Sequence, residues 1–314
     1  MLSYAVLFAG FALLIYGANV FVSASVQIAR KLGIPTVIIG LTIVAMGTSA
    51  PEAVITVTAS LRGSNGLAIG NIVGSNIFNL IFIIGLCAII KPLPVKLKEV
   101  SKDFWLSIGG AFLLLVLLTL GGDFIPRFGS LAMLLIFLVY LALLIRRGIK
   151  EHVETESSKN EKHILISVLL AVVGGGLIIF GGHLTVESAT DIAVSLGVSD
   201  RIIGLTVVAI GTSAPELVTS LVACKKGENE FALGNIVGSN IFNILFILGL
   251  VGIISPLEIV DGLTIDTAFL LIGSLITFVF VYTQKVLARK EGFFMVALYL
   301  GYIIYTLGGF SLWF

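Results

Sequence analysis

The chain has 314 residues, of which 58% are apolar and only 12% are charged, and its formal net charge is +1. Its mean hydropathy of +1.13 is far from that of soluble domains, in which roughly a quarter of the residues are charged. This composition excludes a soluble domain and a nucleic-acid partner, and it indicates an integral membrane protein surrounded by the lipid bilayer.

Ten apolar stretches are long enough to cross a membrane as helices, which takes about 20 residues each. We therefore predict an all-α integral membrane protein with ten transmembrane helices. Nothing before the first stretch resembles the basic region of a signal peptide, so we expect that stretch to remain as the first helix. The stretches lie near 2–29, 35–61, 66–90, 104–121, 128–145, 163–190, 201–224, 231–254, 265–283 and 292–313.

Two blocks of sequence occur twice at one constant offset. The segment at 40–52, GLTIVAMGTSAPE, recurs as GLTVVAIGTSAPE at 204–216. The segment at 69–86, IGNIVGSNIFNLIFIIGL, recurs as LGNIVGSNIFNILFILGL at 233–250. Such self-similarity predicts a duplicated unit. We expect a first five-helix repeat at 1–150, a short linker at 151–162 and a second five-helix repeat at 163–314.

The basic residues are distributed unevenly over the two sides of the predicted helices. Of the 19 Lys and Arg residues, 16 fall on one side, and only Arg62, Arg127 and Arg201 fall on the other. Because Lys and Arg favour cytoplasmic loops, we expect both termini outside the cell membrane and the central linker in the cytoplasm. Since five is an odd number, the second repeat then enters from the opposite face. Inverted repeats of this kind are typical of many secondary transporters.

Each copy of the first block ends in a carboxylate, Glu52 or Glu216, within otherwise apolar sequence. A carboxylate in hydrocarbon is costly unless it is protonated, paired or bound to a cation. No Lys, Arg or His lies in the central part of any predicted span to neutralise the two carboxylates. The sequence therefore predicts that a cation from solution, or a proton, binds to them.

The residues around the glutamates are suited to holding a metal ion. Pro51 and Pro215 each remove a backbone donor, so carbonyl oxygens before them lose their helical partners. Hydroxyl and amide side chains recur at a spacing of four, which places them on one helix face. Oxygen ligands of this kind suit Na+ and Ca2+, whereas the lack of Cys and His disfavours zinc, copper or iron. The pairs with this spacing are Thr48 with Glu52, Thr212 with Glu216, Ser75 with Asn79, and Ser239 with Asn243.

The motifs GTSAPE and GNIVGSNIFN, each present twice, resemble the alpha repeats of the Ca2+:cation antiporter superfamily, and specifically those of the Na+/Ca2+ exchangers. The resemblance implies a core of eight helices around four cation sites, with the first and sixth helices sliding as gates. It implies that Glu52 and Glu216 are shared by Ca2+ and Na+ and that Thr48 and Thr212 are Ca2+ ligands. It groups Ala45, Ser75 and Ser213 at one Na+ site, Ala209, Ser239 and Ser49 at its twin, and Asn79 and Asn243 beside the middle site.

Some relatives carry an aspartate where this chain has Asn243. With two asparagines, the empty site keeps a formal charge of minus two from Glu52 and Glu216. One Ca2+ neutralises that charge, whereas three Na+ leave one positive charge over, so we expect electrogenic exchange. The aspartate accompanies K+ dependence in one branch of the family, so its absence argues against K+ cotransport.

Three alternatives to Na+/Ca2+ exchange differ in chemistry. An H+/Ca2+ exchanger would use the carboxylates as proton carriers, but such relatives typically carry an additional acidic residue where both copies here read GNIVGSN. A cation channel would also use carboxylates and carbonyls, although channels usually build the pore from several subunits. An intramembrane enzyme is disfavoured because there is no HExxH motif and no credible nucleophile. We expect no enzymatic activity, no cofactor and no obligate protein partner, with Ca2+ and Na+ as the bound substrates.

Overall fold

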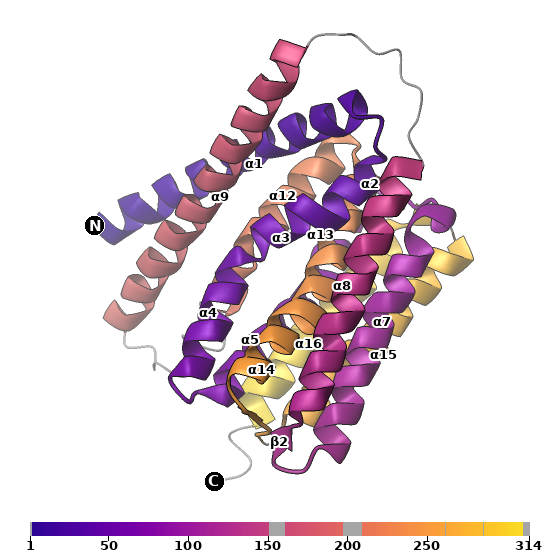
Figure 1. The fold of residues 1–314 in the computed structure, drawn as a ribbon. Helices are drawn as coiled ribbons and strands as arrows, with labels where there is room; N and C mark the ends of the chain where they lie inside the picture. The colour runs from indigo at the N-terminus through magenta and orange to yellow at the C-terminus, as the bar shows by residue number, and fades with distance from the viewer. Residues whose placement is uncertain (1, 151–160, 197–208, 261, 285, 310–314) are drawn as a thin grey trace.

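The computed structural model of the protein describes residues 2–150, 161–196, 209–260, 262–284 and 286–309, and nearly all of them form helices (Figure 1). Within these ranges, seven helices are long and apolar enough to cross a membrane, or eight if one bent pair counts as a single span. The predicted class, an all-α integral membrane protein, agrees with this architecture. The number of ten spans stays a prediction, because the expected seventh span, 201–224, lies partly outside the described residues.

Two long helices form a separate crossed pair beside the rest of the bundle (Figure 1). They are α1, Leu2–Lys31, and α9, Glu161–Ser195. Glycines let their backbones touch: a Cβ atom added at Gly17 would lie 2.9 Å from the carbonyl oxygen of Gly174, and one added at Gly181 would lie 2.8 Å from that of Gly10. Small residues at such crossings permit close packing between membrane helices. The predicted first and sixth spans therefore pack against each other as a unit.

The predicted second span is broken at Ser49. It begins as α2, Thr36–Ile39, continues through the π-helix η1, Gly40–Val44, and α3, Ala45–Thr48, and resumes as α4, Ala50–Leu61. The two halves are bent by 46°. Pro51, in the first turn of α4, has no N–H to continue the helical ladder, which explains the position of the break. The described part of the predicted seventh span has the same form, with α11, Ala209–Thr212, and α12, Ala214–Lys226, meeting at Ser213.

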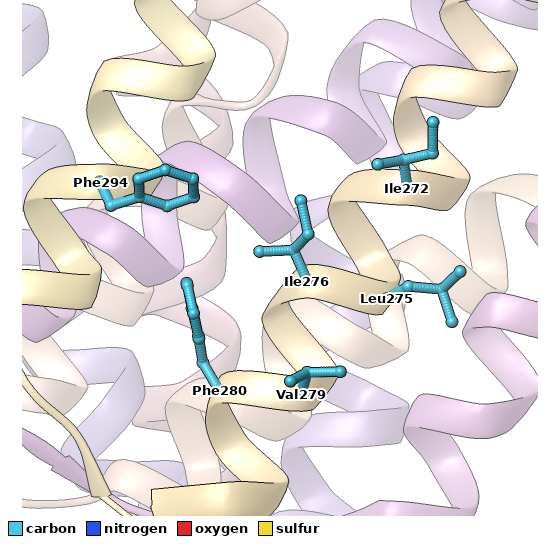
Figure 2. Close-up of a pocket in the computed structure, with 6 residues that line it drawn as sticks. All are labelled: Ile272, Leu275, Ile276, Val279, Phe280 and Phe294. Carbon is cyan, nitrogen blue, oxygen red and sulfur yellow. The ribbon is translucent and has the colours of Figure 1, made fainter.

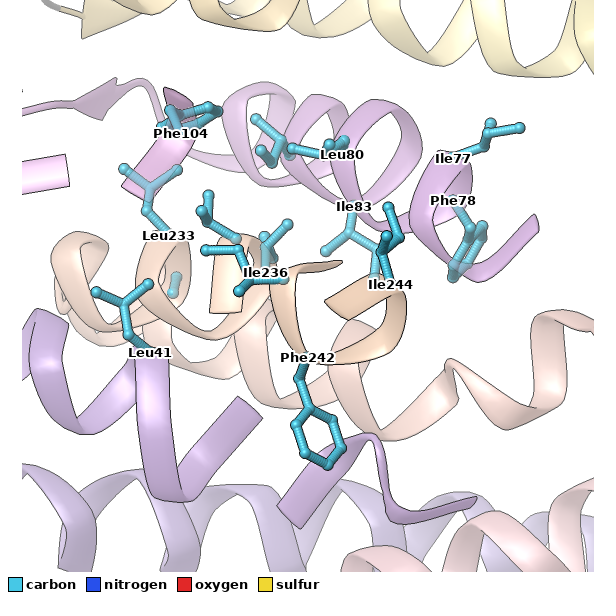
Figure 3. Packing of buried hydrophobic residues seen from close by; sticks show 14 of the residues in the cluster. Leu41, Ile77, Phe78, Leu80, Ile83, Phe104, Leu233, Ile236, Phe242 and Ile244 are labelled. Atoms are coloured by element: carbon cyan, nitrogen blue, oxygen red, sulfur yellow. The ribbon is translucent and has the colours of Figure 1, made fainter. Parts of the chain in front are cut away.

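Two continuous spans occupy the centre of the bundle. One consists of α5, Asn65–Ile77, the π-helix η2, Phe78–Ile83, and α6, Ile84–Ile90. The other consists of α13, Asn229–Ile241, the π-helix η4, Phe242–Leu248, and α14, Gly249–Ile254. Apolar side chains of both spans form the core together with those of the broken helix and of the helix α7, Leu97–Leu120 (Figure 3). These two spans are buried on all sides because neighbouring helices surround them, which explains their near-continuous apolar sequence.

Four further helices line the outside of this core. They are α7, Leu97–Leu120, α8, Arg127–Lys150, α15, Leu263–Gln284, and α16, Arg289–Gly309. Their outer faces expose large apolar side chains, as expected for contact with lipid. Figure 2 shows one such face, a groove of about 370 Å³ between α15 and α16 that only apolar side chains line. These are Ile272, Leu275, Ile276, Val279, Phe280 and Phe294.

Four strands of two residues each connect the two halves of the chain. β1, Leu93–Pro94, pairs antiparallel with β4, Val286–Leu287, and β2, Phe124–Ile125, pairs antiparallel with β3, Leu257–Glu258. The 24-residue helix α7 separates β1 from β2, and at 1.5 Å per residue it is roughly 36 Å long. The two pairings therefore lie at opposite ends of the bundle. Pairs this short leave no signature in the sequence, and none was predicted.

Candidate cation site

Both glutamates of the repeated motif lie at the breaks of their helices. Glu52 is in the first turn of α4 and Glu216 is in the first turn of α12, and both side chains are 0% exposed. The amino-terminal end of a helix carries partial positive charge, which favours a carboxylate there. The local sequence thus explains both the break and the position of the acid, because proline and glutamate follow the same serine in each copy.

A pair of exchanged hydrogen bonds joins the two breaks. The hydroxyl of Ser49 donates to Oε1 of Glu216 at 2.7 Å, and the hydroxyl of Ser213 donates to Oε1 of Glu52 at 2.9 Å. Each serine occupies the N-cap position of its helix, yet neither makes a side-chain cap hydrogen bond. An N-cap hydroxyl normally bonds its own helix. Here it bonds the carboxylate of the other half of the chain, so the two carboxylates belong to one site.

A second serine contacts each carboxylate from a central span. Ser75 donates to Oε1 of Glu52 at 3.4 Å, and Ser239 donates to Oε1 of Glu216 at 3.4 Å. Ser75 and Ser213 therefore meet at Glu52, while Ser239 and Ser49 meet at Glu216.

The structure gives contacts for one of the two alanines assigned by resemblance. The carbonyl oxygen of Ala45 accepts the Ser49 amide at 3.0 Å and lies 3.5 Å from the Ser239 hydroxyl. It therefore lies near Ser239, which also contacts Glu216, and its predicted grouping with Ser75 and Ser213 stays a prediction. Ala209 begins α11, and the segment before it lies outside the described residues.

Of the buried polar atoms without a hydrogen-bond partner in the described ranges, five belong to four residues predicted for the cation site. They are Oε2 of Glu52, Oε2 of Glu216, both amide atoms of Asn79 and Oδ1 of Asn243. All four side chains are 0% exposed. Asn79 and Asn243 lie in the π-helices η2 and η4, a type of distortion that is frequent at functional sites. Buried polar atoms are rarely left unpaired in native proteins, so unpaired oxygens in one place indicate a ligand.

In the described part of the chain, no protein cation balances the charge of the two glutamates, since none of the ion pairs there involves Glu52 or Glu216. The same residues contain no group of three or more His, Cys, Asp and Glu side chains suited to a metal. A cation here would therefore bind two carboxylates completed by neutral hydroxyl, amide and carbonyl oxygens, which suits hard cations.

The two threonines are held by asparagines that sequence reasoning missed. Thr48 donates to Oδ1 of Asn235 at 3.1 Å, and Asn235 in turn donates to Ser220 at 3.0 Å. The equivalent contacts in the other half run from Thr212 to Asn71 at 3.5 Å and from Asn71 to Thr56 at 3.1 Å. Each asparagine thus holds one threonine from a neighbouring helix. Their position inside the repeated motif GNIVGSN was the available signal.

A third pair of motif asparagines was also missed. Asn76 and Asn240 are buried and bond across the interface of α5 and α13, and Oδ1 of Asn76 also accepts the side-chain amide of Asn243 at 3.0 Å. That bond uses the nitrogen of Asn243 and leaves its Oδ1 for another partner. The arrangement fixes the orientation of Asn243, whereas Asn79 has no such partner among the described residues.

Comparisons with known proteins agree with this geometry. Residues 2–146 and 166–308 match the model of a family described as sodium/calcium exchanger protein. The chain is similar to sodium/calcium exchanger MaX1 of Methanosarcina acetivorans, at 30% identity over 96% of this chain and 97% of that protein. It is also similar to the uncharacterized membrane protein MJ0091 of Methanocaldococcus jannaschii, at 35% identity over 93% of each chain. Among solved structures it resembles the sodium-calcium exchanger NCX_Mj, with a TM-score of 0.85 and 33% identity over 96% of this chain and 98% of that one.

Proposed function

Because the chain belongs to the sodium/calcium exchanger family, whose members are transporters rather than enzymes, we propose that it exchanges Na+ for Ca2+ across the cell membrane by alternating access. Cation/Ca2+ exchange is the activity of the family. The observation that carries the proposal for this chain is the set of unpaired buried oxygens on Glu52, Glu216, Asn79 and Asn243. A partly dehydrated cation requires oxygens of this kind.

Charge supports electrogenic exchange that is independent of K+. Glu52 and Glu216 are the two formal charges of the proposed site, since Asn79 and Asn243 are neutral amides. One Ca2+ balances the two carboxylates, and three Na+ exceed them by one positive charge. Transport of three Na+ against one Ca2+ therefore moves net charge. A third carboxylate, which K+-dependent relatives carry at the position of Asn243, is absent from this sequence.

Twelve residues form the proposed binding site, and the serines among them divide into two groups according to the carboxylate that each one contacts. Glu52 and Glu216 are the carboxylates shared by Ca2+ and Na+, and the threonines provide further Ca2+ ligands. The serines line two Na+ sites, one beside each carboxylate, and the alanine carbonyls also contribute to these sites. The remaining residues of the site are Thr48, Thr212, Ser49, Ser213, Ser75, Ser239, Asn79, Asn243, Ala45 and Ala209.

The proposed architecture consists of two inverted five-helix repeats, 1–150 and 163–314, with ten transmembrane helices in all. Exchanged contacts support it: Ser49 bonds Glu216 while Ser213 bonds Glu52, and β1 pairs with β4 while β2 pairs with β3. A twofold axis in the membrane plane produces such reciprocal pairs. The distribution of basic residues favours extracellular termini and a cytoplasmic linker at 151–162.

For the moving part of the mechanism, we propose the crossed pair α1 and α9. Its close glycine contacts let the two helices slide as one body past the site. An empty site would expose two uncompensated carboxylates to apolar surface during that movement, whereas a bound Ca2+ or a set of Na+ ions removes the charge. The empty carrier is therefore penalised, which couples the two fluxes.

The function is tested by Ca2+ flux into proteoliposomes that contain the full-length chain. An outward Na+ gradient should drive Ca2+ uptake, and clamping the membrane potential at a negative internal value with a K+ ionophore should change its rate. A pH gradient alone should drive none. Uptake that follows only the pH gradient would establish H+/Ca2+ exchange instead, and Ca2+ flux without any counter-ion would indicate a channel.

A further inference from the structure

A cavity of about 470 Å³ outside the cation site lies between the ends of α7 and α8, and half of its lining residues are cationic. Lys102, Arg146 and Lys150 are exposed at its edge, and Arg147 is half-buried. Asp103, the one carboxylate in the lining, is buried. Leu143 and Leu144 complete the apolar part of the wall together with the ring of Tyr140.

The single carboxylate of the cavity is already fully engaged. Oδ2 of Asp103 accepts a bond from Nη1 of Arg147 at 3.2 Å, and Oδ1 accepts the hydroxyl of Tyr140 at 3.0 Å. Nη2 of Arg147 also donates to the carbonyl oxygen of Glu99 at 2.7 Å. The guanidinium is thereby fixed at the base of the cavity. None of the ion pairs in the described residues involves Lys102, Arg146 or Lys150, so these three cations keep their charge available.

The second half of the chain shows that the packing of these helices does not require the cations. There, Tyr302 of α16 donates to Oδ1 of Asp266 of α15 at 3.0 Å, in the same way that Tyr140 bonds Asp103. The residue before Asp266 is Ile265, and the residues that follow Tyr302 at the spacings of Arg146 and Arg147 are Gly308 and Gly309. The Asp–Tyr bond and aromatic contacts, such as the stacked rings of Phe269 and Tyr302, join that helix pair without cations at these positions. The four cations are an addition specific to the first pair.

We propose that this cavity binds the phosphate group of an anionic phospholipid. Its position at the ends of two membrane-spanning helices places it where lipid headgroups lie. Basic pockets between transmembrane helices bind anionic headgroups in this way. The planar guanidinium of Arg147 provides a rigid donor, the flexible Lys102 and Lys150 enclose the anion, and the exposed apolar face of α8, including Leu143, receives the acyl chain.

The test uses the full-length protein in detergent and native mass spectrometry with two lipids of identical acyl chains, phosphatidylglycerol and phosphatidylcholine. The wild-type protein should bind phosphatidylglycerol at least about tenfold more tightly than phosphatidylcholine, since each Lys or Arg side chain near the membrane surface favours an anionic lipid. The triple variant K102Q/R146Q/K150Q should lose that preference. Arg147 is left unchanged because it holds α7 and α8 together, and an unchanged melting temperature will show that the variant is folded.

A matched control removes the same charge elsewhere. Lys91, Arg289 and Lys290 are exposed and do not line the cavity, so K91Q/R289Q/K290Q should keep the wild-type preference. If both triple variants lose it equally, the lipid responds to diffuse surface charge and the site is refuted. If millimolar inorganic phosphate displaces phosphatidylglycerol from the wild-type protein, the cavity takes a soluble phosphate and the lipid assignment is wrong.

Discussion

Asn76 and Asn240 exchange hydrogen bonds across the centre of the protein: each side-chain amide donates to the backbone carbonyl of the other, at 3.1 and 3.0 Å. Both side chains are buried. The two bonds connect α5 with α13, and these are the helices that carry Ser75 and Ser239 to the carboxylates. The geometry of the cation site therefore depends on how this pair fixes the two central helices.

We expect each asparagine to stabilise the protein through its own bond. Asn76→Ala and Asn240→Ala each remove one side-chain donor, while the backbone carbonyl that accepts the other bond remains. Each variant should therefore lower the free energy of unfolding by about 0.5–1.5 kcal/mol, measured by unfolding of the detergent-solubilised protein. Thr306→Ala serves as the control, because the Thr306 hydroxyl bonds within its own helix. Losses no larger than that of the control would contradict a specific clamp.

Replacing either central carboxylate should abolish exchange. In Glu52→Gln and Glu216→Gln the amide oxygen can still accept the serine hydroxyl, but the charge that balances Ca2+ is lost. We expect Na+-driven Ca2+ uptake to fall more than about 100-fold, because even the second-shell partners of metal ligands change affinity by 10–100-fold. Asp266→Asn changes a membrane carboxylate that bonds Tyr302 instead. It should transport nearly as the wild-type protein does, and wild-type rates in either glutamate variant would refute the site.

The asparagines behind the threonines should affect Ca2+ affinity indirectly. Asn235→Ala frees Thr48 from its 3.1 Å bond, and Asn71→Ala frees Thr212 from its 3.5 Å bond. We expect an increase of about tenfold in the apparent Kd for Ca2+, typical of lost second-shell partners, with the larger effect for Asn235→Ala because its bond is shorter. Equilibrium Ca2+ binding measures both. Ser255→Ala, far along the chain from either threonine, should leave Ca2+ affinity unchanged.

Sequence was a good guide to the central spans because their apolar runs are continuous. The predictions 66–90 and 231–254 differ from the structure by at most two residues at either end. The break of the second span was also predictable, since Pro51 cannot continue a helix. By contrast, α9 extends to Ser195, five residues beyond its predicted end. Glu187 and Asp191 lower the hydropathy there without interrupting the helix.

The charged residues of the candidate site could be predicted from their chemistry. The contacts that residues make with distant parts of the chain could not. Buried carboxylates are rare in membranes, so Glu52 and Glu216 stood out. Residue chemistry alone did not show that Ser49 bonds the glutamate of the other half, because an N-cap serine bonds its own helix in most proteins. Only the family resemblance grouped Ser49 with Ser239. The roles of Asn71 and Asn235 were hidden for the same reason: they depend on which threonine each one meets across the helix interface.

Close backbone packing beside the site gives a further prediction. A Cβ atom at Gly238 would lie 2.8 Å from both Cα and the carbonyl oxygen of Leu41 and 2.9 Å from Cβ of Ala45. We expect Gly238→Ala to destabilise the protein by about 1–3 kcal/mol, the usual effect of overpacking. It should also reduce Na+-driven Ca2+ uptake, because the added methyl group displaces the broken helix. Gly109→Ala is the control, because an added Cβ meets nothing within 4 Å there and should stabilise α7 by up to about 1 kcal/mol.

The second half of α1 is attached to the end of α12 and to the residues just after it by an ion pair and two hydrogen bonds. Arg30 lies 2.8 Å from Oε1 of Glu228, and Nζ of Lys226 donates to the carbonyl oxygen of Asn19 at 2.8 Å and to Ser23 at 2.6 Å. If α1 is a moving gate, these contacts hold it in one of its positions. Glu228→Gln should therefore release that end of α1 and raise amide hydrogen exchange across residues 19–31.

The size of this effect is limited by solvent, since the Arg30 side chain is 67% exposed. An exposed ion pair contributes about 0–1 kcal/mol, so we expect the rate of amide hydrogen exchange in this part of α1 to rise by up to about fivefold. Glu230→Gln, which breaks the 2.6 Å pair of Glu230 with Lys96, involves neither proposed gate and should leave α1 unchanged. High ionic strength should reproduce the Glu228→Gln effect in the wild-type protein, because salt screens exposed charges. Choline chloride is the appropriate salt, since Na+ would also bind at the proposed transport site. Equal responses of α1 in the Glu228→Gln and Glu230→Gln variants would show that the ion pair does not hold the gate.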